Sequence, residues 1–249
     1  MTSNQAISAV RCTAAGSSAG FSLVEILVGM VIALISILVV LQVFALNEGQ
    51  KRTTTSGVDA QQSSLVGLHL LERDLRQAGY GVKGLPVPCL SPPVAIAGPA
   101  GERVITLMYS KSAVGNVNAE GCNDTNTAHY RYSVVANGAH RDLQREELGA
   151  AGNVAKAEKL VTNVVALAAE PLPNAAAPTA IRVAVAARSN LREKPDPAFG
   201  CNVTPQPLLM WPGGPAVTPP DDGSGIPNAW KCYRYRVQQT IVPLRNLVW

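Results

Sequence analysis

The sequence lacks the motifs on which most catalytic and metal sites depend. Its three histidines, His69, His129 and His140, are scattered, and no H-E-x-x-H, G-x-S-x-G or phosphate-binding glycine loop is present. The oxygen-rich turns at 123–126 and 221–225 do not have the spacing of a known calcium loop. The sequence therefore predicts a protein that is not an enzyme and that needs no metal or cofactor.

Charged residues form no long basic run, and they are almost absent from residues 21–46. No run of lysine and arginine is present, so we expect no direct binding of nucleic acid. From Phe21 to Leu46 the only charged side chain is Glu25, and no proline occurs before Gly79. A helix over 21–46 would be about 39 Å long, enough to span a bilayer with some tilt.

The apolar block is too long for the core of an ordinary signal peptide, although Val43-Phe44-Ala45 has the form of a cleavage site. A plain membrane anchor explains the length but leaves Glu25 without a reason. An ionised carboxylate inside hydrocarbon costs about 2.5–3.5 kcal/mol on insertion scales, so it needs a partner. One local explanation is a capping box, because Ser22-Leu23-Val24-Glu25 has the S-x-x-E form.

Five cysteines occur, and none belongs to a C-x-x-C pair. Cys12 precedes the apolar block, whereas Cys89, Cys122, Cys201 and Cys232 follow it. An even set of four fits two disulfides in an oxidising compartment, and four cysteines allow three connectivities. We favour Cys89–Cys122 with Cys201–Cys232, because neither loop then threads through the other; four reduced, partly buried thiols are the alternative.

The segment Gly20-Phe21-Ser22-Leu23-Val24-Glu25 resembles the processing site of type IV prepilins and the related pseudopilins. The resemblance implies that a membrane-embedded prepilin peptidase cuts between Gly20 and Phe21 and methylates the new amine of Phe21. Residues 1–20 would be a cytoplasmic leader and 21–46 a transmembrane helix of an inner-membrane protein. Glu25 would then pair with an N-terminal amine, its own or that of a neighbouring subunit, which lowers the burial energy of both charges.

Residues 47–80 are expected to continue the helix with an apolar stripe on one face. We expect this stripe to hold a sheet against the helix, through Leu65, Leu68, Leu71 and Leu75. Gly79 is free to take a left-handed cap and to end the helix.

Residues 81–249 are expected to form an extracytoplasmic antiparallel sheet domain, which makes the fold class α+β, the type IV pilin fold. Residues 190–228 hold many prolines and no strand pattern, and we expect a long surface loop there. The predicted strands are Arg103–Tyr109, His129–Ala136, Leu160–Ala168, Ile181–Arg188 and Lys231–Val242.

Two further segments, Leu71–Gly81 and Thr240–Asn246, are similar to the helix end and the C-terminal strand of PilW-type minor pilins. The resemblance implies a minor pilin that initiates assembly and sits at the pilus tip. Its partners would be other minor pilins, the major pilin and the inner-membrane assembly platform. A minor pseudopilin of a type II secretion system is the alternative. A tip adhesin, with a ligand pocket near Trp211 and Trp230 in or beside the 190–228 loop, is a third reading.

Overall fold

The computed structural model describes residues 22–80, 93–111, 127–149, 152–175, 178–193 and 200–247. The chain divides into two compact units, Met1–Gly49 and Gln50–Trp249, and we call the second unit the head. One helix, α1 (Leu23–Gln77), contributes residues to both units.

The described part of the first unit is helical and apolar. Among the described residues, one stretch, Leu23–Ala45, is long and apolar enough to cross a membrane. Its large hydrophobic side chains are all exposed in the isolated chain, as Leu23 (79%) and Leu34 (63%) illustrate. Ser36 donates its hydroxyl to the carbonyl of Ile32 at 2.8 Å, so this polar group is satisfied within the helix. A lipid bilayer is the solvent that suits such a surface.

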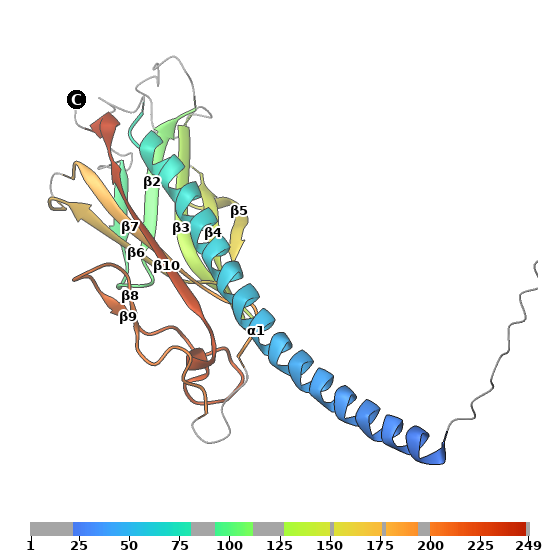
Figure 1. Ribbon diagram of the computed structural model, residues 1–249. Coiled ribbons are helices and arrows are strands. Elements are labelled where there is room, and N and C mark those ends of the chain that lie inside the picture. Colours follow the sequence, from blue (N-terminus) through green and yellow to red (C-terminus); the bar gives the residue numbers. More distant parts are fainter. Residues whose placement is uncertain are drawn as a thin grey trace, which may run out of the picture. The chain divides into compact units, whose positions relative to one another are not determined.

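The head contains the second half of α1 and three antiparallel sheets (Figure 1). The order of strands is β1-β2-β3-β4-β5 in the first sheet and β10-β7-β6 in the second, and β8 pairs with β9. Two short 3-10 helices, η1 (Ala229–Cys232) and η2 (Arg245–Leu247), flank β10. The strands are β1 (Val94–Ala97), β2 (Val104–Ser110), β3 (Thr127–Asn137), β4 (His140–Leu148), β5 (Val154–Thr162), β6 (Val164–Leu172), β7 (Ala180–Arg188), β8 (Leu208–Leu209), β9 (Ala216–Val217) and β10 (Tyr235–Pro243).

The main core lies between the second half of α1 and the two larger sheets. It joins Leu68, Leu71 and Leu75 of the helix to side chains from both sheets, such as Leu143 of β4 and Val185 of β7. The α+β fold class, with a long helix packed on antiparallel strands, is thereby confirmed.

Gly67 shows how closely the helix approaches the sheets. A Cβ at this position would lie 3.3 Å from Cγ1 of Val185 and 3.4 Å from Cδ2 of Leu143. A glycine inside a helix costs about 1 kcal/mol relative to alanine. Here the missing side chain leaves room for close contact with both sheets.

The predicted strand Leu160–Ala168 is wrong as a single element. Asn163 interrupts it with φ 61, and the chain passes there from β5 in one sheet to β6 in the other. Asparagine adopts this left-handed conformation more readily than most residues, which suits it to the crossing.

The segment 190–228 also differs from the expected surface loop. Its described residues include the β8–β9 hairpin, and Leu208, Met210 and Trp211 form a second hydrophobic cluster with alanines of β6 and β7. A few residues later, η1 occupies Ala229–Cys232, so the last strand begins at Tyr235 and not at Lys231. The β8–β9 hairpin and the residues that join its strands therefore pack on the second sheet.

Candidate functional site

The start of α1 is the part of the predicted assembly site that the structure describes. Ser22 precedes the first helical residue, and its carbonyl accepts hydrogen bonds from the amides of Glu25 at 2.9 Å and Ile26 at 3.2 Å. Glu25 therefore lies in the first helical turn, where the free amides of a helix favour a negative charge. Gly20 and Phe21 lie outside the described residues. The predicted pairing of Glu25 with an N-terminal amine thus stays a prediction.

The other end of α1 is held by a buried carboxylate that the sequence analysis missed. Asp74 is only 2% exposed and lies on the core side of the helix. Tyr132 of β3 donates its hydroxyl to Oδ2 of Asp74. Arg145 of β4 donates to the same oxygen at 3.3 Å, and Nε of Arg73 donates to Oδ1 at 3.0 Å. These donors replace the hydration that the carboxylate loses on burial.

The ionic cluster around Asp74 extends across the first sheet. Arg145 also pairs with Glu158 of β5 at 2.8 Å, and its guanidinium lies 4.8 Å from the ring centre of Tyr130. Burial and the hydrogen bond to Asp74 raise the pKa of Tyr132 well above its usual range, so its hydroxyl remains a donor. A single helical carboxylate thus connects α1 to three neighbouring strands.

The last turn of α1 is capped from the C-terminal part of the chain. Nδ2 of Asn246 donates to the carbonyl oxygens of Arg76 at 3.1 Å and Ala78 at 3.3 Å. Gly79 then turns the chain with φ 78, and its amide donates to the carbonyl of Met108 in β2 at 2.8 Å. Helix ends leave carbonyl groups without partners, and this arrangement supplies them.

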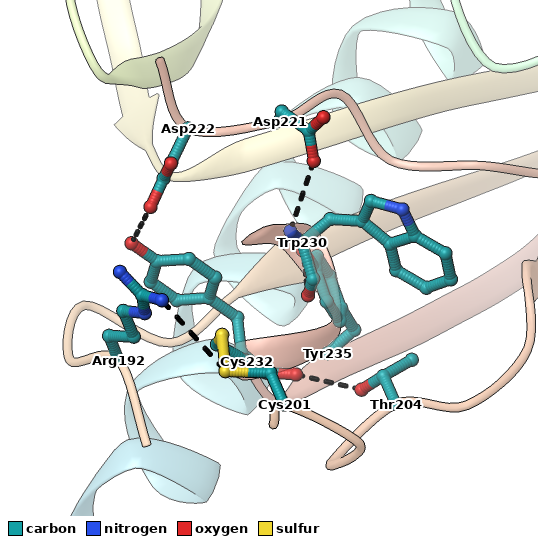
Figure 2. The surroundings of a disulfide bond; sticks show 9 residues. Arg192, Cys201, Thr204, Asp221, Asp222, Trp230, Cys232 and Tyr235 are labelled. Carbon is teal, nitrogen blue, oxygen red and sulfur yellow. Dashed lines mark hydrogen bonds between the residues drawn. A yellow bond between two sulfur atoms is a disulfide. The ribbon is translucent and has the colours of Figure 1, made fainter. Parts of the chain in front are cut away.

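A disulfide joins Cys201 to Cys232, the last residue of η1, shortly before β10 begins (Figure 2). Their Cα atoms are 4.7 Å apart, and Cys232 is fully buried. Arg192 lies beside the bond, with Nη2 3.9 Å from Sγ of Cys201. Thr204 donates its hydroxyl to the carbonyl of Tyr233 at 2.7 Å, which ties the segment to the residue after Cys232.

The two carboxylates of the 221–225 turn are occupied by hydrogen bonds within the head. Tyr233 donates its hydroxyl to Oδ2 of Asp222 at 2.8 Å, and the amide of Ser224 donates to Oδ1 at 2.9 Å. Burial opposes ionisation, but the hydrogen bonds from Ser224 and Tyr233 prevail and lower the pKa of Asp222 to about 2. Asp221 accepts from the amide of Trp230 at 3.3 Å. No group of potential metal ligands is found among the residues that the structure describes.

The predicted packing residues of α1 divide into two groups. Leu68, Leu71 and Leu75 are buried in the core, whereas Leu65 is 45% exposed and is not part of it. In this turn Ser64 and Gly67 take the buried positions instead, since Ser64 lies four residues before Leu68 and continues the same helix face.

The predicted cysteines and tryptophans can be placed only in part. Cys201 and Cys232 are paired, while Cys89 and Cys122 lie outside the described residues. Trp211 is 7% and Trp230 is 6% exposed, so both side chains are largely packed inside the head.

No protein-family model matches the chain, and no curated protein matches it. Among solved structures, the chain is similar to a type IV-like pilin, TTHA1219, from Thermus thermophilus. The two share 15% identity over 74% of this chain and 95% of that chain, with a TM-score of 0.43.

Proposed function

We propose that this protein is a minor pilin that helps to initiate the assembly of a type IV pilus and is located at its tip. The observation that carries the proposal is the contrast between the two parts of α1. The stretch Leu23–Ala45 is apolar and exposed, with Glu25 as its only charge, whereas Leu68, Leu71 and Leu75 are buried in the head. A helix built this way exposes an apolar surface to lipid or to other helices and carries a folded domain.

The prepilin-like segment from Gly20 to Glu25 supports processing by a prepilin peptidase. In the proposed pathway the chain is a single-pass protein of the inner membrane, with the head in the periplasm. It then joins other minor pilins and the major pilin on the assembly platform. The Cys201–Cys232 disulfide suits an oxidising compartment such as the periplasm.

The first test is intact mass and N-terminal sequencing of the protein from its native membrane. We expect a mature chain that begins with N-methylated Phe21. A chain that begins at Leu46 would identify a secreted protein with a cleaved signal peptide, and an uncut chain would identify a simple anchor. Either result contradicts the proposal.

A pseudopilin of a type II secretion system would pass the same test. Deletion of the gene separates the two functions, since loss of a minor pilin reduces surface pili and leaves secretion intact. Loss of secretion with normal piliation would favour the pseudopilin instead.

A further inference from the structure

Two adjoining cavities lie in the head along β6, and the larger of them lies between β6 and β1. Their volumes are about 400 and 230 Å³, within or near the range of ligand sites in proteins. Both are lined by Arg103, Ala169 and Pro171. The larger is also lined by Val94 and Ile96 of β1 and the smaller by Trp211. We call the two together the β1–β6 groove.

One wall of the groove is a strand edge that no other described strand covers. Among the described residues, β1 is the terminal strand of the first sheet and pairs only with β2. The carbonyl of Pro93 accepts from the amide of Met108 in β2, so the peptide groups of residues 93, 95 and 97 face β2. Alternation along a strand turns the peptide groups of Val94 and Ile96 to the opposite side. Both residues line the larger cavity.

The other wall is the outer edge of β6, which no described strand covers. β6 is a terminal strand of the second sheet, and its outer edge is bonded at Leu167. There the amide of Leu167 donates to Gly101 at 2.8 Å, and Arg103 donates its amide to Leu167 at 3.0 Å. By the same alternation, the amide and carbonyl of Ala169 and the carbonyl of Pro171 face this edge. Within the described residues, no backbone hydrogen bond beyond Leu167 closes it.

The junction of the two cavities carries a positive charge, that of Arg103, which no described carboxylate pairs with. Arg103 donates a side-chain hydrogen bond to the carbonyl of Gly98, and no carboxylate of the described ranges forms an ion pair with it. Glu170, which lines the smaller cavity, pairs with Arg182 at 3.4 Å. The guanidinium of Arg182 in turn lies 5.5 Å from the ring centre of Trp211. Among the described residues that line the groove, Arg103 therefore carries the charge that an incoming carboxylate would complement.

We propose that the β1–β6 groove binds an extended, mainly apolar peptide segment of a partner protein, with an acidic side chain opposite Arg103. The segment adds a strand beside Val94–Ile96 or Ala169–Pro171 and forms backbone hydrogen bonds with that edge. The acidic residue is internal to the segment, because Arg103 lies where the cavities meet and the chain continues into both. This proposal does not depend on the function proposed above.

The test uses the full chain in detergent micelles and a synthetic peptide as probe. The peptide is acetylated and amidated, alternates valine and threonine, and has one central glutamate. Calorimetry gives the affinity, and hydrogen exchange locates the site. We expect binding together with slower exchange at the amides of Ile96 or Ala169. Absence of binding, or binding that leaves both amides unprotected, overturns the proposal.

Matched changes separate the contributions of charge and backbone. Glutamine in place of the peptide's glutamate is expected to weaken binding roughly tenfold, without any change to the protein. Arg103→Gln is expected to do the same, whereas Arg236→Gln on the exposed face of β10 has no effect. N-methylation of alternate peptide amides is expected to abolish binding. Equal affinity of the methylated peptide overturns strand addition. A peptide whose only carboxylate is its free C-terminus is a further probe. If it binds more tightly, the acidic group is not internal to the segment, and that part of the proposal is overturned.

Discussion

The Nδ2 atom of Asn246 lies 3.1 Å from the carbonyl oxygen of Arg76, which is 170 positions earlier in the sequence. This hydrogen bond joins the segment that ends α1 to the segment that follows β10, so residues far apart in the sequence cap the helix. The carbonyl of Thr179 also accepts from the amide of Leu244 at 2.9 Å, which fixes the strand that leads to the cap.

Replacement of Asn246 should loosen the end of α1 and leave the rest of the head intact. Asn246→Ala removes the donor to Arg76 and Ala78, and we expect a loss of about 1 kcal/mol in the free energy of unfolding. Hydrogen exchange should rise in the last turn of α1. Gln239→Ala, on an exposed position of β10, is the control and should change neither quantity. Unchanged exchange in the last turn would mean that the cap is not formed in solution.

The carboxylate of Asp74 should matter far more than its neighbour Glu72. Asp74→Asn removes a buried charge that accepts from Tyr132, Arg145 and Arg73, and we expect a loss of about 1.5–3 kcal/mol in chemical denaturation. Glu72→Gln breaks only an exposed pair with Arg76 and should cost about 0.5 kcal/mol or less.

A double-mutant cycle with Tyr132→Phe tests whether the two groups act together. If the hydroxyl stabilises the head through Asp74, the effects of the two substitutions are not additive. Additive losses would show that the hydroxyl of Tyr132 acts independently of Asp74.

Much of the fold could be predicted from local sequence, but the polar contacts that hold the end of α1 to the sheet could not. The apolar stretch Leu23–Ala45 has the pattern of a membrane-spanning helix, and the predicted strands His129–Ala136 and Ile181–Arg188 lie within β3 and β7. The strand β4 was missed because its sequence, His140–Leu148, is rich in charge. In the structure those charges pair with side chains on other elements, as Arg141 does with Glu102 at 2.7 Å and Glu146 with Arg131 at 2.6 Å.

Asp74 could have been found from its position. It follows Leu71 by three residues and precedes Ala78 by four, so helical periodicity places it on the apolar face. A charged residue on that face indicates a buried partner. The identity of the partners depends on strands far along the chain, and local sequence does not contain that information.

The disulfide should contribute substantially to the stability of the head. Cys201 and Cys232 are separated by 31 positions, and the chain-entropy estimate for such a loop is about 3–4 kcal/mol. Cys232→Ala should lower the free energy of unfolding by an amount of this order. Peptide mapping without reduction should yield a fragment that links the two cysteines. A fragment that links Cys201 to Cys89 would contradict the pairing.

The turn at Asp222 should show a defined response to acid. The pKa of Asp222 is lowered from an ordinary 3.8 to about 2, so the stabilising effect of the ionised carboxylate is fully present above pH 3.8. The effect is lost as the pH falls toward 2. Tyr233→Phe removes a hydrogen bond to the carboxylate and should raise the pKa of Asp222, as measured by NMR titration. Tyr235→Phe is the control, because that hydroxyl donates to the carbonyl of Trp230. A pKa unchanged by Tyr233→Phe would contradict the assignment.

Substitution of Glu25 should separate processing from assembly. Glu25 lies in the first turn of α1 and is the only charge in an otherwise apolar stretch. In the function proposed above, Glu25→Val leaves the Gly20–Phe21 cleavage site intact, so the protein should mature normally, as judged by its mass. It should fail to support piliation, because a buried N-terminal amine then lacks a counter-charge. Glu48→Gln, beyond the apolar stretch, should assemble normally.

Gly20→Ala should instead slow or block cleavage. Normal piliation with Glu25→Val would contradict the charge-pair argument, whereas normal cleavage with Gly20→Ala would contradict the assigned cleavage site.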